Sequence, residues 1–588
     1  MKTIRILMLS ISVLAINACN NAPKQLENTD FDIVVQSSYE PESFHPTNNI
    51  SAFRTQLFTL TQRAPLRVDL ESLELTPMLL SALPKTEDGI HYEYQFLQDI
   101  RWDDGSRMTA YDMLFSIKTV LSAQTNNPSL RPLFRGTIAD AWVDEQDSFK
   151  LHMRCVELHA ANIQILSECY VLQAALWDSA GVMNKYTVPE ILVQADSLET
   201  DWANSFNAFE KGSEAMWQTG LGAYKFSGWE KGEYILLERK ENWWGEGKPG
   251  IHNLANPSRI FFKFITDDNA TMLALRKGEI DVTNKIATNE FVSLLNEEAF
   301  VQQYNTMIHD MMGYTYLGMN MKPDGMNRKP IFTGQKTRRA MAHAIPVDEI
   351  VSTVLADIGG DRQVSIISKL LKEEFNEALS PIEFDLAKAA ALLAEDGWGD
   401  ENKDGTLDRR EQGKRIDFRF ELNILSGKQS TVDIALIIQD NLKKLGIDMS
   451  INALEFNTFY AAAYSHDFDA IMGAWNMSAG YTDQTQLWHS STWDGGSNFC
   501  GFGNAYSDSL IEFSNTTLDN NLRLKASKEL QKEVYDVQPY VFLYSMKGKL
   551  AVHKKFKNVK VYIERPYIMI NAFDYDESFQ SDTIQVVN

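Results

Sequence analysis

Cysteine and histidine are scarce in this chain, and neither is spaced for chemistry. The 588 residues include four cysteines and ten histidines, and the metal and dithiol patterns H-E-x-x-H and C-x-x-C are absent. The serine nucleophile motifs G-x-S-x-G and S-x-x-K are absent as well. The acidic pair Asp103-Asp104 precedes a glycine and is expected in a turn rather than in a glycosidase site. We therefore predict no catalytic residue and no enzyme activity.

Positive charge is the second shortage. Lysine and arginine number 56 against 79 aspartates and glutamates, which gives a formal net charge of −23. A strongly acidic body repels phosphate backbones and anionic lipid surfaces. We therefore expect no nucleic-acid partner and no flat attachment to a membrane surface.

Apolar runs long enough to cross a bilayer are also missing. Residues 6–16 are apolar but too few to span one. They follow Lys2 and Arg5 and precede Asn17-Ala18-Cys19, which resembles a bacterial lipoprotein signal cleaved before Cys19. Residues 1–18 are then a signal peptide, acylated Cys19 is a lipid anchor, and residues 19–30 are a polar tether. The alternative is an ordinary secretory signal with an incidental cysteine.

Three cysteines remain after such a leader: Cys155, Cys169 and Cys500. An exported protein permits disulfides, and the nearness of Cys155 to Cys169 in sequence favours that pair, which leaves Cys500 as the odd thiol. The alternative is three free, buried cysteines.

What the chain does contain is enough material for a large, multidomain α/β protein. Its length predicts two or three domains, and apolar residues make up 44% of it. Alternating strands are expected at 92–96 and 234–238, and a further strand at 259–265 leads into a helix that ends at Gly278. Thr109 is placed to cap a helix that reaches about Leu121. Helices and strands alternate again over 387–475, which predicts a mixed sheet.

Several short blocks occur in a characteristic order along nearly the whole mature chain. Together they resemble the extracytoplasmic solute-binding proteins of the oligopeptide, dipeptide and nickel ABC-transporter class (family 5). The blocks are the P-x-x-F-x-P loop at 41–46, W-D-D-G-S-R-M-T-A-Y-D at 102–112, the glycine-rich and Trp-Trp stretch 220–282, Y-T-Y-L-G-M-N at 314–320 with 336–348, and P-Y-V-F-L-Y at 539–544.

The resemblance implies a two-lobed periplasmic binding protein of class II, cluster C type, with mixed β-sheets and an additional inserted domain. Lobe I is expected from residues 31–53, 205–295 and 545–588, the inserted domain from 54–204, and lobe II from 296–544. The chain is expected to cross between the lobes near residues 295 and 545, and the lobes to close about these crossings.

The implied function is that of a monomeric, membrane-anchored extracytoplasmic receptor. It binds an oligopeptide-like solute between its lobes and delivers it to an ABC permease. Two alternatives use the same scaffold: a non-peptide solute such as a glycan or a metal chelate, and a sensor that does not transport.

The ligand site is expected around the strand that ends at Trp475. In peptide-binding relatives an aspartate follows such a tryptophan by three residues and neutralises the ligand's amino terminus, whereas this chain has Ser478 there. The nearest acid is Asp483, so either Asp483 takes that role or the ligand lacks a cation. The candidate ligand-binding residues are Trp475, Ser478, Tyr481, Asp483, Trp493, Asn498, Glu40 and Tyr316.

Residues 400–411, D-E-N-K-D-G-T-L-D-R-R-E, match the twelve-residue calcium loop. Gly405 stands at the sharp turn of position 6. A helix precedes the loop but a strand is expected after it, so it is an isolated loop and not a paired EF-hand. The alternative is a solvated Asp-Gly turn, as occurs at this place in the resembled family. The candidate ligands of a structural Ca²⁺ are Asp400, Asn402, Asp404, Thr406 through its carbonyl, Asp408 and Glu411.

Overall fold

The computed structural model describes residues 32–47, 52–127, 130–193, 200–208, 219–322, 329–411 and 413–579. The predicted signal peptide, Cys19 and the tether lie outside these residues. Within the described part of the chain, no helix has both the length and the apolar character needed to cross a membrane.

A single sheet of twelve strands runs through both halves of the molecule. Ten strands form its continuous path, and β11 (Tyr304–Asp310) and β13 (Gly360–Arg362) pair in addition with β19. The path runs in the order β17 (Asp448–Leu454), β16 (Arg419–Leu425), β18 (Ala470–Asn476), β12 (Gly313–Met319), β19 (Tyr540–His553), β10 (Val282–Thr283), β1 (Asp32–Ser37), β9 (Arg259–Phe264), β8 (Tyr234–Arg239) and β7 (Tyr224–Glu230).

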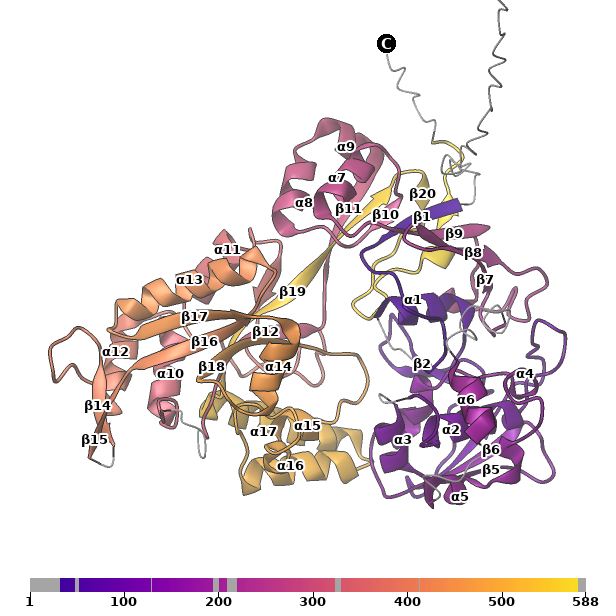
Figure 1. Cartoon of the computed structure of the whole chain (residues 1–588), viewed down its shortest axis with the longest axis horizontal. Helices are drawn as coiled ribbons and strands as arrows, with labels where there is room; N and C mark the ends of the chain where they lie inside the picture. The colour runs from indigo at the N-terminus through magenta and orange to yellow at the C-terminus, as the bar shows by residue number, and fades with distance from the viewer. Residues whose placement is uncertain are drawn as a thin grey trace, which may run out of the picture.

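Strand β19 is the element that the two halves share. Its first part pairs with β12 and β13, as far as Met546 opposite Gly360. From Lys547 onward it pairs with β11 and then also with β10. In Figure 1, β19 accordingly runs as one long strand from the left half of the molecule to the upper right. The chain therefore changes halves inside β19, between Met546 and Lys547.

The other crossing lies between β11, which pairs on the lobe I side of β19, and β12, which pairs on the lobe II side. The boundary expected near residue 295 precedes this point, because α9 (Glu298–Gln303) and β11 still belong to the lobe I side. The two halves are thus joined by two neighbouring strands of one sheet.

Lobe I is built on β1, which pairs in parallel with β9 and β10. Helices α7 (Asp268–Arg276), α8 (Thr288–Leu295) and α9 lie together over this part of the sheet (Figure 1), and their buried side chains form one core with Phe261 and Ala551. Helix α1 (Ala52–Thr61) packs near β7 on the way to the inserted domain.

The inserted domain carries a separate antiparallel sheet in the order β4 (His91–Gln95), β6 (Lys150–Cys155) and β5 (Ile138–Val143). Helix α2 (Ala110–Leu121) packs on it, and Thr109 and Asp112 close its first turn as a capping box. This confirms the predicted cap. The smaller elements are β2 (Leu66–Val68), β3 (Leu75–Pro77), α3 (Arg131–Thr137), η1 (Asn162–Glu168), α4 (Ala174–Trp177), α5 (Val188–Val193) and α6 (Thr200–Asn207).

Lobe II has helices on both faces of its sheet. Along β12 the side chains alternate, so that Leu317 joins one core and Tyr316 the other. The first core includes α10 (Gln335–Ala344), α11 (Val347–Thr353), α12 (Leu386–Glu395) and α13 (Gln429–Lys443). The second includes α14 (Phe456–Tyr464), α15 (Thr485–Trp488), α16 (Ala505–Thr516) and α17 (Asn520–Val537). The predicted two-lobed α/β class is confirmed.

The favoured disulfide between Cys155 and Cys169 is not present. Cys155, Cys169 and Cys500 are all free and buried. Burial raises the pKa of the Cys155 and Cys169 thiols to about 12, which keeps both protonated and unreactive at neutral pH. The two cysteines lie in the apolar core of the inserted domain and act there as small apolar side chains.

Substitutions in β19 test its central place in the packing. Leu543 is fully buried in the lobe II core, so Leu543→Ala is expected to lower the free energy of unfolding by about 2–5 kcal/mol. Met546 lies on the same strand and is 40% exposed, so Met546→Ala is expected to change it by only about 0.5 kcal/mol. Urea unfolding followed by circular dichroism measures both, and equal effects of the two substitutions would contradict this account of the strand.

Candidate functional site

The segment that follows β18 reaches across to the other half of the molecule. The Ala479 backbone N–H donates to Glu564 Oε2 at 2.6 Å, and the side-chain Nε2 of Gln164 donates to the Tyr481 carbonyl at 2.8 Å. A Cβ on Gly480, whose φ is +93°, would lie 3.2 Å from Gln164 Oε1. Residues 477–483 of lobe II, which we call the bridging loop, therefore rest directly on the inserted domain and on the C-terminal segment.

Asp483 is held by side chains of both halves. Its Oδ1 accepts hydrogen bonds from the Thr485 N–H at 2.8 Å and from Asn515 Nδ2 at 3.0 Å. Its Oδ2 lies 3.6 Å from His159 Nε2 of the inserted domain. Burial alone would raise the pKa of this carboxyl, but the bonds from His159, Thr485 and Asn515 outweigh it and lower the pKa to about 2. Asp483 already has partners within the protein, so it acts as a latch and is not the anchor for a ligand amine that the sequence suggested.

Tyr481 is the other predicted residue that lies between the halves. Its hydroxyl donates to Asn515 Oδ1, the Arg523 guanidinium lies 4.9 Å from its ring centroid, and the His159 ring meets it edge-on. Ser478 is exposed at the start of the bridging loop. Ser478, Tyr481 and Asp483 thus lie at the junction of the halves, where Tyr481 and Asp483 are engaged in protein contacts, and their role as ligand residues stays a prediction.

The predicted aromatic residues form a stack inside lobe II. Tyr316 is 2% exposed and lies parallel to Tyr540, with ring centroids 3.8 Å apart. The Trp475 ring is also nearly parallel to that of Tyr316, and Trp475 Nε1 donates to Tyr540 Oη at 3.3 Å. Because Tyr316 is enclosed, it is a packing residue, and only the half-buried Trp475 retains a surface.

The remaining predicted ligand residues serve local structure. Asn498 is buried and exchanges hydrogen bonds with Phe502. Trp493 lies flat on His466 at 3.5 Å between ring centroids. Glu40 accepts from Trp229 Nε1 at 2.6 Å and so ties the segment after β1 to the β7–β8 hairpin. The contacts of Asn498 use both of its polar atoms and argue against it as a ligand residue, whereas Glu40 is exposed and its assignment stays a prediction.

Several charged groups near the junction of the halves are surrounded by protein, although solvent still reaches them. Glu168 is exposed, yet burial among protein atoms raises the pKa of its carboxyl, with a further contribution from Glu564. Arg67 and Tyr170 are only half-buried, yet burial lowers the pKa of Arg67 and raises that of Tyr170. Groups with shifted pKa values are candidates for a functional site, because a charged ligand gains most from them.

A basic group that is likewise surrounded by protein lies near the strands where the chain crosses between the halves. Lys285, which follows β10, is exposed, but burial and then the charges of Arg565 and Lys428 lower its pKa. Lys428 precedes α13 in lobe II, whereas Lys285 and Arg565 belong to the lobe I side. The charges at the junction thus act on one another: Glu564 influences Glu168 and Arg67, and Arg565 and Lys428 influence Lys285.

The sequence alone did not indicate any of these charged residues as a candidate ligand residue. Arg67, Glu168 and Tyr170 come from the inserted domain, about 300 residues or more before Trp475, and Glu564 comes from the C-terminal segment. Their only signal is the joint effect of their charges on one another, which depends on the tertiary structure.

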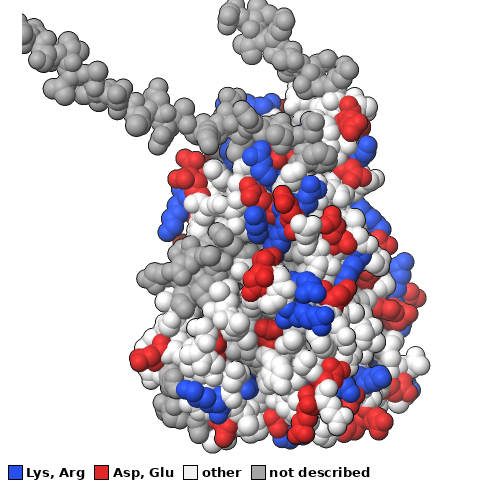
Figure 2. Space-filling model, turned by 90° about the vertical axis from the view of Figure 1, so that its right-hand side faces the viewer, with Lys and Arg blue, Asp and Glu red and all other residues white. Residues whose placement is uncertain are grey.

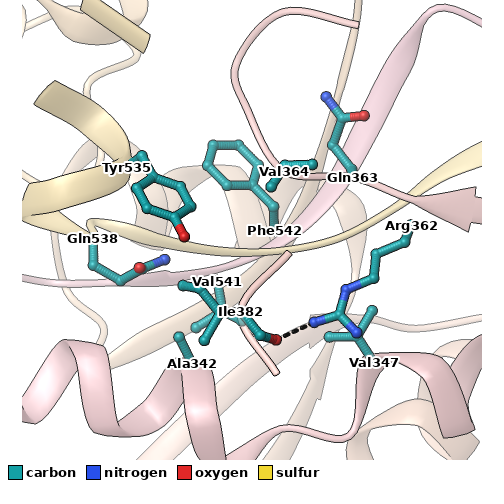
Figure 3. Close-up of a pocket in the computed structure, with 10 residues that line it drawn as sticks. All are labelled: Ala342, Val347, Arg362, Gln363, Val364, Ile382, Tyr535, Gln538, Val541 and Phe542. Atoms are coloured by element: carbon teal, nitrogen blue, oxygen red, sulfur yellow. Dashed lines mark hydrogen bonds between the residues drawn. The ribbon is translucent and has the colours of Figure 1, made fainter. Parts of the chain in front are cut away.

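A small cavity elsewhere does not fit the role of ligand site. The cavity lies inside lobe II beside β19, and Figure 3 shows Val541, Phe542 and Ile382 among the residues that line it. The Arg362 guanidinium donates to the Ile382 carbonyl across its rim. This cavity lies within one half and is not reached by the bridging loop, so closure of the halves would not enclose it.

The predicted calcium loop lies between α12 and β14 (Asp408–Glu411), and β14 forms a hairpin with β15 (Lys414–Asp417). The Asp400 carboxylate accepts from the backbone N–H groups of Asp404 at 3.1 Å and Gly405 at 3.1 Å. Gly405 has a φ of +87°, which makes the sharp turn that the pattern requires.

Glu411 does not fit its predicted place as the twelfth ligand. It accepts from Arg409 Nη2 at 3.0 Å, and a strand rather than a helix follows the loop. Successive side chains of a strand point to opposite faces, so Glu411 lies on the face of Arg409 and away from Asp408. The described residues also hold no group of three acidic, histidine or cysteine side chains already gathered for a metal.

Comparison with known proteins assigns the fold to a family. The family model described as "Bacterial extracellular solute-binding proteins, family 5 Middle" matches residues 74–498. The chain belongs to this family. The family 5 resemblance predicted from the short sequence blocks is thereby confirmed.

Individual family 5 proteins match over nearly their full length. The chain is 26% identical over 546 residues to the oligopeptide-binding protein AppA of Bacillus subtilis, covering 91% of this chain and 90% of that protein. The structure of AppA from Bacillus subtilis in complex with a nonapeptide superposes with a TM-score of 0.69 at 23% identity, covering 93% of this chain and 99% of that one. NikZ from Campylobacter jejuni, in complex with Ni(L-His), gives a TM-score of 0.66 at 20% identity over 90% and 96% of the two chains.

The Asp483 latch predicts a pH-dependent stability. Because the folded state lowers the Asp483 pKa to about 2 from an ordinary 3.8, its carboxylate stabilises the fold above about pH 4, and this contribution is lost as the pH falls toward 2. Asp483→Asn is expected to lower the free energy of unfolding by about 1 kcal/mol at pH 7, which is typical for the loss of a partly exposed, hydrogen-bonded charge.

Thermal unfolding between pH 7 and pH 3 measures this effect. The difference in melting temperature between the wild type and Asp483→Asn should narrow below pH 4. The control Asp494→Asn, at an exposed neighbouring residue, should leave the melting temperature unchanged at every pH. A difference in melting temperature that stays constant with pH would show that the charge of the Asp483 carboxylate does not stabilise the fold.

Proposed function

We propose that this family 5 protein is an extracytoplasmic receptor that binds an oligopeptide-like solute between its two halves and delivers it, unchanged, to an ABC permease. The observation that carries the proposal is that the bridging loop of lobe II bonds to Glu564 on the lobe I side, next to acidic and basic groups with shifted pKa values that would line a cleft between the halves. A peptide carries an ammonium and a carboxylate on one backbone, so it complements such a cleft at both ends.

The cleft charges suggest how the two ends of a peptide are recognised. Apart from the effect of burial, the charge of Glu564 raises the pKa of Glu168, and a ligand ammonium beside the two carboxyls would relieve that repulsion. Arg67, Lys285 and Arg565 are available for carboxylates. The backbone of the bridging loop can add hydrogen bonds to the peptide main chain, which tolerate varied side chains.

Closure and release follow from the connections between the halves. Only β19 and the turn between β11 and β12 carry the described chain across the sheet, so a rotation about these two strands opens the cleft. The Asp483–His159 latch and the Ala479–Glu564 hydrogen bond join the halves on the far side of the cleft. Opening of the two halves breaks only a few such polar contacts.

The charge of the remaining surface is in keeping with a solute receptor. On the face shown in Figure 2, acidic and basic side chains are interspersed, without a broad basic patch. The proposal retains a monomeric receptor that is held at the membrane by acylated Cys19. Replacing Cys19 with serine should move the protein from the membrane fraction to the soluble fraction, and loss of uptake in that variant would link the anchor to transport.

Binding of defined peptides tests the proposal. Short peptides with a free amino terminus should bind in calorimetry and reduce the radius of gyration in solution scattering, and mass spectrometry should recover them intact. A nickel–histidine chelate and an oligosaccharide serve as the competing solutes. Binding of either in place of every peptide, or recovery of a cleaved peptide, would refute the proposed receptor.

Glu168→Gln probes the acidic end of the cleft. The variant should bind a free-amine peptide about tenfold more weakly, because about 1.4 kcal/mol of charge pairing is lost, and should bind the N-acetylated peptide as the wild type does. Since the Glu168 pKa is raised, wild-type affinity should fall on acidification at a higher pH than for an ordinary glutamate. The exposed Glu145 of the same domain provides the control, Glu145→Gln, which should leave both affinities unchanged.

A further inference from the structure

A buried carboxylate without a partner stands at the base of the loop 400–407. Asp408 is 1% exposed, and among the residues that the structure describes neither of its carboxylate oxygens has a hydrogen-bond partner. Removing an ionised carboxylate from water without compensation costs several kcal/mol. A side chain in this position calls either for a proton or for a cation.

Asp408 points toward the loop that it terminates. Its backbone pairs with Gly399 at the other end of that loop, through N–H···O contacts of 2.9 Å and 2.5 Å. Its neighbours Leu407 and Arg409 turn to the lobe II core, where Leu407 packs and Arg409 lies 4.5 Å from the Trp398 ring centroid. Because side chains alternate along a strand, Asp408 faces away from that core, toward the loop.

A second carboxylate increases the need for a cation. Asp417 on β15 is directly opposite Asp408 in the hairpin register, and like charges in directly opposed positions destabilise a strand pair. Asp417 accepts from Arg415 Nε at 3.0 Å, which leaves Asp408 as the uncompensated member.

The arginines around the loop are committed to other acids. Arg409 bonds Glu411 at 3.0 Å and Arg410 pairs with Glu401 at 3.2 Å. Arg419 lies 3.4 Å from Asp448 and 3.9 Å from Asp404. No cation of the protein thus neutralises Asp408 among the described residues.

We propose that the loop 400–408 binds one Ca²⁺ ion, with Asp400, Asn402, Asp404, the Thr406 carbonyl and Asp408 as its oxygen ligands. These are positions 1, 3, 5, 7 and 9 of the calcium-loop pattern, and water completes the shell in place of the twelfth-position glutamate. Hard oxygen ligands in a flexible loop suit Ca²⁺, whereas Mg²⁺ demands a more rigid octahedron.

Binding must draw the ligands together, which sets the affinity. Asn402 Nδ2 now donates to Asp404 Oδ2 at 2.8 Å, so Asn402 turns to present its oxygen when the ion enters. Ordering of this exposed loop opposes binding. We expect a dissociation constant of about 10⁻⁴–10⁻³ M, as in other extracellular calcium modules.

The ion would fix the loop to the core of lobe II and would not touch the solute. The Leu407 N–H donates to the Gly446 carbonyl at 2.7 Å, and the Phe418 N–H to the Leu407 carbonyl at 2.7 Å. The site therefore couples calcium to the turn between α13 and β17 and to the start of β16. Its role is structural stabilisation, independent of peptide binding.

Calorimetry with CaCl₂ on the purified protein, after treatment with EDTA, tests the proposal. One ion should bind per chain, Asp408→Asn should weaken binding at least tenfold, and the control Glu411→Gln should leave it unchanged, since Glu411 faces away. MgCl₂ should bind at least tenfold more weakly than CaCl₂. The proposal would be overturned if no heat of binding were measured up to 10 mM CaCl₂. It would also be overturned if Asp408→Asn and Glu411→Gln lost Ca²⁺ affinity equally.

Thermal unfolding separates a metal ligand from a merely structural aspartate. In CaCl₂ the wild type should be more stable than Asp408→Asn, and in EDTA this order should reverse, because the substitution removes an uncompensated buried charge. A variant that is less stable than the wild type by the same amount in both buffers would show that Asp408 holds no cation. Peptide affinity should not change between the two buffers, so this result stands apart from the proposed receptor function.

Discussion

Strand β19 is the constraint on which the rest of the structure depends. One fourteen-residue strand supplies hydrogen bonds to β12 and β13 in lobe II and to β10 and β11 in lobe I. Its buried side chains alternate between the helix layers, so the cores of both halves are anchored to it. The halves cannot separate without breaking this strand, but they can rotate about it.

The junction of the halves combines contacts of two kinds. The bridging loop makes specific, satisfied hydrogen bonds, and Asp483 is their most heavily bonded member. Beside it lie charges that the protein leaves incompletely paired, notably Glu168 and Lys285. Satisfied groups hold a closed conformation, whereas groups shifted from their ordinary pKa mark a place where a charged ligand gains most. A receptor that must release its cargo needs both.

In the loop 400–408 the sequence pattern agrees with the tertiary structure only in part. Its spacing follows the calcium pattern as far as position 9, and the Asp400 hydrogen bonds form the expected turn. The pattern then fails at Glu411, because β14 replaces the helix that would carry a twelfth ligand to the ion. The same strand, however, buries Asp408 without a hydrogen-bond partner among the residues that the structure describes.

The sequence by itself determined the family, the class of fold and many elements. The strand at 234–238, the Thr109 cap and the helix before Gly278 follow from periodicity and capping, which act over a few residues. Only the tertiary structure decided which side chains are available. Asn498, Tyr316 and Asp483 read as ligand residues in sequence but are enclosed or already bonded. Arg67 and Glu168 carry no local signature, because their environment is created by segments that meet only when the chain is folded.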